Sequence, residues 1–230
     1  MQHSVIVTGG TGGLGSAVVA RLLDYGWRVV VPWVVERELE RVQEREGLEL
    51  VQADLFDDDA VGAVVSLAAG SGDAPLGGVV NLVGGFSMGD RVHETPIEEF
   101  EKQFRLNLRP TYLVVAAAVP HLLSGGGGSI VCVGTRAAVQ PFSGAAGYIS
   151  SKAAVIAFAQ AVAAEYKNDG IRCNAILPSV IDTPANRASM PKADFDKWVK
   201  PAEIAGVIAH LLSDASRPTS GAAIPVYGRA

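Results

Sequence analysis

The sequence predicts an α/β protein: one doubly wound, mostly parallel sheet of seven strands with helices on both faces. Short apolar segments typical of buried parallel strands alternate with longer segments typical of helices. The first strand runs directly into a glycine-rich turn, and the 230 residues contain no internal repeat or low-complexity linker. These observations favour a single domain over residues 1–230, with right-handed crossovers.

Composition narrows the possible functions. Hydrophobic residues make up 49% and charged residues 19%, which is typical of a buried sheet and not of disorder. The net charge of −5 argues against a nucleic-acid or membrane-surface binder, because these need clustered Lys and Arg. Cys132 and Cys173 lie in apolar segments without metal-ligand spacing. We therefore expect reduced core thiols, no metal and a cytoplasmic protein.

The N-terminal segment has the pattern strand, turn, helix. Val5–Val7 is a short apolar strand, Thr8–Gly15 is the turn, and a helix runs from about Leu14 to Tyr25. Such a turn brings backbone N–H groups and a helix N-terminus to one point, where a pyrophosphate can approach the glycine backbone. No Gly-Lys-Ser/Thr follows, so the turn is not a Walker A loop. Its place between the first strand and the first helix favours a dinucleotide.

Further strand and helix segments follow in order. The predicted strands are 27–35, 48–54, 76–85, 129–133, 171–178 and 222–228. The predicted helices are 36–46, 57–70, 98–123 with a kink or break at Pro110, 153–166 and 201–214. Residues 184–200 are polar and irregular, which predicts a substrate lid. Ligands bind at the carboxyl ends of such strands, where the sequence places Thr8, Trp33, Asp54, Asn81 and Thr135.

Tyr148 and Lys152 are the candidate catalytic pair. They lie four residues apart before a long Ala-rich helix, so on a helix they share one face. A phenol with a pKa of about 10 exchanges protons poorly at neutral pH, and lowering the pKa to about 7 needs about 4 kcal/mol. An ammonium about 4 Å away supplies about that energy at an effective dielectric constant of about 20. Such pairs also occur by chance, so the neighbouring motifs decide whether Tyr148 is a general acid/base.

Five motifs in order resemble the short-chain dehydrogenase/reductase family over essentially the whole chain. They are Thr8-Gly9-x-x-x-Gly13-x-Gly15, Asp54-Leu55, Asn81-x-x-Gly84, Asn107 and Tyr148-x-x-x-Lys152, with Pro178–Thr183 after the sixth strand. The glycines also fit the spacing of a longer epimerase-like branch, but 230 residues leave no room for the substrate domain of that branch. The resemblance implies a Rossmann-like fold, an NAD(P)H cofactor and a small-molecule substrate.

The resemblance implies how the catalytic residues act. Tyr148 exchanges a proton with the substrate oxygen or nitrogen while a hydride moves to or from the nicotinamide. Lys152 lowers the Tyr148 pKa and holds the nicotinamide ribose, and Asn107 helps to carry a water-linked proton path. Without the resemblance, Asn107 reads as a polar residue at a helix kink beside Pro110.

The resemblance also implies a cofactor site along the strand ends. Asp54 meets the adenine, and Asn81 lies near the adenosine ribose. Thr183, with the backbone near Ile181, holds the carboxamide. Each polar residue has an alternative role as a helix cap or turn former. Further cofactor contacts are expected at Thr8, Gly9, Thr11, Gly13, Leu14, Gly15, Leu55, Gly84 and Pro178.

The chain departs from the family pattern near the substrate. Thr135 stands where the family usually has Ser, thirteen residues before Tyr148. Its hydroxyl can still donate to a substrate oxygen, but its methyl group narrows the pocket. Residues 177–198 and Gly84-Gly85-Phe86 look like dihydropteridine reductase, which implies reduction of a quinonoid imine. The alternative is a subfamily scaffold with varied substrates. We expect an aromatic pocket formed by Phe86, Met88, Thr135, Phe142, Met190 and Trp198.

The choice between NAD and NADP depends on the end of the second strand. An acid there would accept the ribose hydroxyls and repel a 2′-phosphate, but this chain has Trp33. Trp33 could stack on the adenine or simply cover apolar surface. Arg37 could reach a 2′-phosphate, although Glu36 and Glu38 flank it. The residues favour NADPH slightly, whereas the dihydropteridine reductase likeness favours NADH.

Two apolar helices predict oligomerisation. Residues 112–123 and 153–166 are apolar nearly all round, which predicts burial on more than one side. The family resemblance implies that these helices pair across the axis of a homodimer, alone or within a homotetramer. A functional alternative of another class is a non-catalytic NAD(P)-sensing protein. The intact Tyr148–Lys152 pair argues against it, because a sensor has no use for a tuned phenol.

Overall fold

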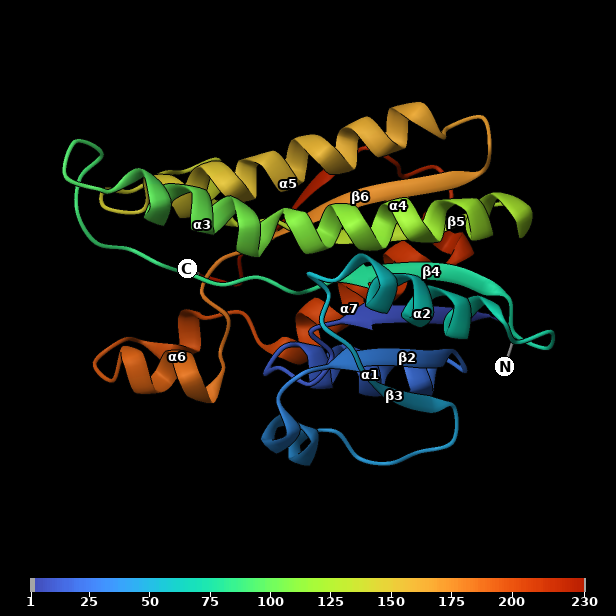
Figure 1. The fold of residues 1–230 in the computed structure, drawn as a ribbon. Coiled ribbons are helices and arrows are strands. Elements are labelled where there is room, and N and C mark those ends of the chain that lie inside the picture. The colour runs from blue at the N-terminus through green and yellow to red at the C-terminus, as the bar shows by residue number, and fades with distance from the viewer. Residues whose placement is uncertain (1–2, 230) are drawn as a thin grey trace.

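A seven-stranded sheet forms the centre of the computed structural model, which describes residues 3–229 (Figure 1). Its strand order is β3-β2-β1-β4-β5-β6-β7, and every neighbouring pair is parallel. The predicted doubly wound architecture is thus confirmed. The strands are β1 Ser4–Thr8, β2 Arg28–Trp33, β3 Leu48–Gln52, β4 Leu76–Asn81, β5 Gly128–Val133, β6 Ile171–Pro178 and β7 Ala223–Val226.

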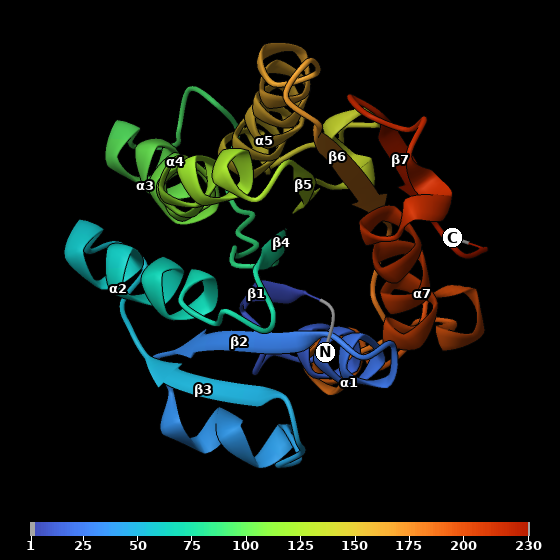
Figure 2. The same cartoon turned by 90° about the vertical axis from the view of Figure 1, so that its right-hand side faces the viewer.

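Helices cover both faces of this sheet (Figure 2). Two separate groups of buried apolar side chains join α2, α4 and α5 to one face and α1 and α7 to the other. Alternate residues of one strand feed the two groups: Ile6 enters the first, and Val5 and Val7 enter the second. The helices are α1 Gly15–Asp24, α2 Asp58–Ala69, α3 Ile97–Asn107, α4 Arg109–Ser124, α5 Ala146–Glu165, α6 Pro184–Ser189 and α7 Pro201–Leu212.

Local sequence signals explain two helix ends near the site. α2 begins where the Asp57 carboxylate accepts hydrogen bonds from the N–H groups of Asp59 and Ala60, as a capping residue does. The predicted interruption at Pro110 separates α3 from α4 at Leu108. Pro110 cannot donate a backbone hydrogen bond, so the helix cannot continue regularly through it.

Three element predictions need correction. The sequence predicts a helix over residues 36–46, but only a short 3-10 helix forms, Glu36–Arg41, and the chain is extended at Val42. This polar segment has no apolar stripe to bury, and tertiary packing of such a stripe stabilises most helices. The helix predicted from residue 153 already starts at Ala146. The segment 184–200, predicted as a lid, is not irregular throughout, because it contains α6 and a 3-10 turn, Phe195–Lys197.

Helix α5 also has the length and composition of a membrane span, the one such helix among residues 3–229. It packs against β5 and β6 inside the domain, and its Ser151 and Lys152 are buried. A core helix of a folded domain meets the same compositional test.

Candidate active site

The predicted site residues gather at the carboxyl edge of the sheet. Thr8, Trp33, Asn81 and Pro178 are the last residues of β1, β2, β4 and β6. Asp54 and Thr135 follow the ends of β3 and β5 by two residues. Since all strands are parallel, these positions share one edge, as the sequence predicted.

The glycines of the turn after β1 allow its backbone to lie close to the start of α1. Gly9 has a φ of +67°, in the left-handed region, and its carbonyl accepts the N–H of Gly12 at 3.0 Å. A Cβ on Gly15 would overlap the Gly9 carbonyl oxygen and lie 2.6 Å from Gly10 Cα. Only glycine therefore allows α1 to start this close to the turn.

The N-terminus of α1 presents unused hydrogen-bond donors. Among the hydrogen bonds within residues 3–229, none uses the backbone N–H of Gly13, Leu14 or Gly15. No side chain caps this helix end. Free N–H groups at a helix N-terminus favour an anion, so the turn fits a dinucleotide pyrophosphate.

Thr183 closes the other side of this turn. A Cβ on Gly13 would lie 3.1 Å from Thr183 Cγ2, so the segment after β6 packs directly on the glycine turn. The Thr183 hydroxyl caps α6 by accepting the N–H of Asn186 at 3.3 Å. The Ile181 carbonyl already accepts from Asn186 Nδ2 and from the Thr183 N–H, both at 2.8 Å. Thr183 thus has the capping role that the sequence offered as its alternative.

Tyr148 and Lys152 both lie in the first two turns of α5. The Lys152 ammonium donates to the Val133 carbonyl at 2.9 Å. A Cβ on Gly84 would come within 2.9 Å of Lys152 Nζ, so this glycine leaves room for the lysine. The Tyr148 ring meets Phe86 edge to face, with centroids 5.0 Å apart.

Burial dominates the electrostatics of this pair. Burial raises the pKa of the Tyr148 phenol above its ordinary value, and interaction with the Thr135 hydroxyl lowers it to a smaller extent. Burial lowers the pKa of Lys152 to about 8, and the nearby charge of Cys132 opposes this change. Lys152 donates to the Val133 carbonyl, and the Tyr148 pKa shift comes from burial and Thr135, so the predicted lowering of this pKa by Lys152 stays a prediction.

Asn107 connects three segments of the site. Its Oδ1 accepts the Gly85 N–H at 2.9 Å, and its Nδ2 donates to Ser151 Oγ at 3.1 Å. Ser151 Oγ in turn donates to the Tyr148 carbonyl at 2.8 Å. The Asn107 amide therefore holds the turn after β4 against α5. Sequence reasoning missed Ser151, which has no motif of its own.

Thr8 and Asn81, at the ends of β1 and β4, form hydrogen bonds within the protein. Thr8 Oγ1 accepts the N–H groups of Leu82 and Val83, which joins the turns after β1 and β4. The Asn81 side chain is 2% exposed and donates to Cys132 Sγ at 3.9 Å, while its Oδ1 has no partner within residues 3–229. Its ribose contact stays a prediction.

Two predicted cofactor residues after β3 contact only their own neighbourhood. The Asp54 carboxylate accepts the Phe56 N–H at 2.9 Å and stays exposed, whereas the Leu55 side chain is part of the core.

The predicted aromatic pocket forms in part. The ring centroids of Phe86 and Phe142 are 6.4 Å apart, but Trp198 is buried against Phe195.

An unexpected cluster lies on the glycine turn. Thr11 Oγ1 donates to Glu38 Oε2 at 3.0 Å. Arg41 pairs with Glu38 Oε1 at 3.1 Å and also donates to the Thr11 carbonyl at 3.4 Å. Arg37 is exposed. Sequence reasoning missed the role of Glu38, because a regular helix over 36–46 gives no reason for this side chain to reach the turn.

Comparisons with known proteins agree with this architecture. Residues 3–194 match the model of the short chain dehydrogenase family. The chain is 30% identical to 2-(R)-hydroxypropyl-CoM dehydrogenase of Xanthobacter autotrophicus, covering 99% of this chain and 98% of that protein.

Solved structures give the same result. A 3-ketoacyl-(acyl-carrier-protein) reductase from Brucella melitensis, complexed with NADH, superposes with a TM-score of 0.86, 26% identity and coverage of 99% and 98% of the two chains. The protein ElxO with NADP bound shares the fold, with a TM-score of 0.90, 22% identity and coverage of 99% and 98%.

An open parallel sheet with a glycine turn at its carboxyl edge is typical of dinucleotide-binding proteins, and the relatives of this chain are named dehydrogenases and reductases, which supports an NAD(P)-dependent oxidoreductase. The chain belongs to the short-chain dehydrogenase/reductase family. None of these three relatives is a dihydropteridine reductase, so this finer likeness stays a prediction.

Proposed function

We propose that the protein is a reductase that transfers a hydride from NAD(P)H to a small carbonyl, imine or quinonoid substrate, with Tyr148 as the general acid. The observation that carries this proposal is the meeting of two elements at one edge. Thr183 packs on the glycine turn, and Lys152 Nζ lies beside Gly84 in the turn after β4. A dinucleotide held by the turn would extend along this edge toward Tyr148.

The residues divide the work as follows. The bound nicotinamide supplies the hydride. The free N–H groups of Gly13, Leu14 and Gly15 would hold the pyrophosphate. Tyr148 keeps its proton at neutral pH because burial raises the pKa of the phenol. It would donate this proton to the substrate oxygen or nitrogen when hydride transfer makes that atom strongly basic. Thr135, whose hydroxyl interacts with Tyr148, would donate a second hydrogen bond to that atom.

The aromatic surroundings of Tyr148 support a flat substrate. Phe86 and Phe142 lie next to each other at the site and are both partly exposed. Their faces would suit a conjugated ring, in keeping with a quinonoid substrate of the dihydropteridine type. The test is consumption of reduced nicotinamide on a panel of ketones, imines and quinonoid dihydropterin, in wild type and in a variant without the Tyr148 hydroxyl. Tight cofactor binding without turnover on the whole panel would favour a sensing protein.

Glu38 supports NADH over NADPH, against the slight preference read from the sequence. Its carboxylate is fixed on Thr11 and Arg41 beside the turn that would hold the pyrophosphate. A 2′-phosphate about 5 Å away would meet a repulsion of about 3 kcal/mol per unit charge at an effective dielectric constant of about 20. The ribose hydroxyls of NADH could instead donate to the same oxygens.

Glu38→Gln is therefore expected to improve NADPH binding relative to NADH at least about tenfold, or about 1.4 kcal/mol. The change removes charge and keeps shape, and it also frees Arg41 for a phosphate. Calorimetric titration with both coenzymes measures the ratio of dissociation constants. Glu40→Gln, an exposed neighbour in the same turn, is the control and should leave the ratio unchanged. An unchanged ratio in Glu38→Gln would show that Glu38 does not select the coenzyme.

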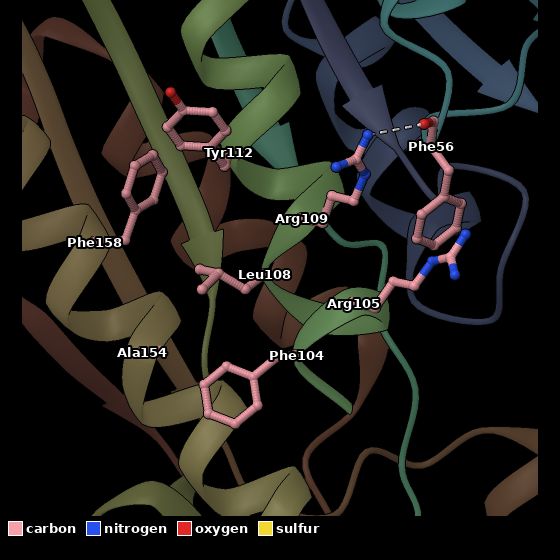
Figure 3. Close-up of a pocket in the computed structure, with 8 residues that line it drawn as sticks. All are labelled: Phe56, Phe104, Arg105, Leu108, Arg109, Tyr112, Ala154 and Phe158. Atoms are coloured by element: carbon pink, nitrogen blue, oxygen red, sulfur yellow. Dashed lines mark hydrogen bonds between the residues drawn. The ribbon is translucent and has the colours of Figure 1, made fainter. Parts of the chain in front are cut away.

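We also propose that the α4–α5 face pairs with a second copy of the chain. Tyr112 and Phe158 lie side by side with centroids 5.9 Å apart, and Tyr112 is 54% exposed (Figure 3). They border a hollow of about 800 Å³. The residues that line it are Phe56, Phe104, Arg105, Leu108, Arg109, Tyr112, Ala154 and Phe158.

Tyr112→Glu together with Phe158→Glu is expected to convert this homodimer or homotetramer to smaller species, because the pairing would bury like charges. Sedimentation velocity measures the change. A wild-type protein that sediments as a 23.9 kDa monomer would refute the pairing.

We also propose that the protein is cytoplasmic, as its two cysteines in apolar segments predict.

A further inference from the structure

Thr135 lies between a fixed strand end and a short turn. On the strand side, the Gly134 N–H donates to the Ile176 carbonyl at 2.9 Å, which continues the pairing of β5 with β6. On the other side, a single 3-10 turn, Arg136–Ala138, leads away from the sheet. Thr135 is 8% exposed, and its hydroxyl accepts the N–H of Ala137 in this turn at 3.3 Å. The direction of the hydroxyl therefore depends on where the turn lies.

The side chain of Arg136 fixes this turn from two directions. A 3-10 turn of three residues is weakly held by its own hydrogen bonds, whose geometry is poorer than in an α-helix. Arg136 Nε donates to Gln140 Oε1 at 2.7 Å. The same guanidinium lies over the ring of Tyr227, with Cζ 5.2 Å from the ring centroid, a position that the ring attracts. A planar guanidinium can stack on a ring and donate hydrogen bonds at the same time. Arg136 thus joins the turn to the C-terminal part of the chain.

Tyr227 is a firm support for Arg136, because its backbone is held on both sides. The pairing of β6 with β7 extends to Val226, directly before it. Ser179 Oγ donates to the Tyr227 carbonyl at 2.6 Å. Beyond it, the Arg229 N–H donates to the Lys197 carbonyl at 3.0 Å. The Tyr227 ring therefore stands at a fixed point relative to the sheet.

We propose that Arg136 and Tyr227 form a clamp that holds the Thr135 hydroxyl in the direction of Tyr148. The inference rests on the proposed reductase function, in which this hydroxyl donates to the substrate atom that Tyr148 protonates. The hydroxyl accepts from Ala137, so its own proton remains to be donated. Arg136 and Tyr227 are positioning residues, because they act through Thr135. A donor displaced by about 1 Å can lose about 100-fold in rate.

Loss of either half of the clamp is expected to slow turnover. Arg136→Met and Tyr227→Leu should each lower kcat about tenfold on the ketone, imine or quinonoid dihydropterin that wild type reduces fastest. Binding of the reduced coenzyme should stay within about twofold of wild type, because the glycine turn is unchanged. Tyr227→Phe keeps the ring and should keep kcat within about twofold. Arg21→Met is the control: it removes a guanidinium that lies over the Tyr25 ring on α1 and should leave kcat unchanged.

The same change in protein without the Thr135 hydroxyl separates positioning from general stability. Thr135→Val should itself lower kcat about 100-fold, as the loss of one preorganised donor does. Adding Arg136→Met to Thr135→Val should then cost less than about twofold, because no hydroxyl remains to be positioned. A tenfold loss in both backgrounds would overturn the proposal and leave the reductase function intact.

A measurement without turnover separates the clamp from the reductase function. The methyl resonance of Thr135, assigned by its absence in Thr135→Val, is followed by NMR in protein labelled at the threonine methyl groups. Its order parameter should fall in Arg136→Met and Tyr227→Leu and stay as in wild type in Tyr227→Phe and Arg21→Met. That result supports the clamp even if wild type reduces no substrate of the panel, which would count against the reductase function alone. Order parameters equal to wild type in both clamp variants would overturn the clamp.

Discussion

Tyr148→Phe is expected to lose about 10²–10⁴ in kcat, which is the usual contribution of a positioned general acid. The variant removes one hydroxyl and keeps the ring that packs edge to face on Phe86. The proposed pyrophosphate site lies on the glycine turn, away from the Tyr148 hydroxyl. Binding of the reduced coenzyme should therefore stay within about twofold of wild type, because only the proton-transfer group is lost. Steady-state turnover and calorimetric titration of coenzyme measure the two quantities.

The control for this variant is Tyr25→Phe. Tyr25 is 66% exposed at the end of α1, away from the strand ends. It should leave turnover and binding as in wild type. Turnover in Tyr148→Phe equal to that of wild type would remove the general acid from the mechanism.

Gly15→Ala is expected to weaken coenzyme binding by at least about 100-fold, or about 2.7 kcal/mol. The added methyl group would overlap the Gly9 carbonyl oxygen and approach Gly10 C at 2.7 Å. These are backbone atoms, so the turn must rearrange, and the N–H groups of Gly13 to Gly15 would lose their common direction. Overpacking of this kind also costs about 1–3 kcal/mol of stability. Titration and urea unfolding measure both effects.

Two further glycines make this prediction specific. A Cβ on Gly62 in α2 would meet no atom within 4 Å beyond its own helix backbone and chain neighbours, so Gly62→Ala should bind coenzyme normally and gain up to about 1 kcal/mol of stability. Gly13→Ala meets only Thr183, with Cγ2 at 3.1 Å, a side chain that can move, and should fold even if Gly15→Ala does not. A folded Gly15→Ala protein with normal affinity would contradict the assignment of the turn.

Sequence patterns predicted the features that depend on residues close together in the chain. Apolar runs and the glycine turn predicted the parallel sheet, and spacing on one helix predicted that Tyr148 and Lys152 lie in adjacent turns of α5. What the sequence did not predict depends on contacts between distant segments. Lys152 donates to Val133, nineteen residues earlier, and no pattern in the sequence records that choice.

Glu38 and Arg136 illustrate the same limit. Glu38 reaches Thr11, 27 residues earlier, from a short 3-10 helix and not from the longer helix predicted at 36–46. Arg136 is a single cation in a segment without a regular pattern. Its significance lies in its contact with Tyr227, near the end of the chain. Both roles come from tertiary placement, which a single sequence does not encode in a motif.

The central place of β1 has a consequence for biosynthesis. One neighbour, β2, follows soon along the chain, but the other is β4, whose Leu76 pairs with Ser4. At about 5–20 residues per second, the ribosome needs several seconds to deliver that partner. During this interval the backbone N–H and C=O groups on one edge of the nascent β1 have no partner strand. The strand that later carries the glycine turn is therefore the one that a chaperone would have most reason to shield during translation.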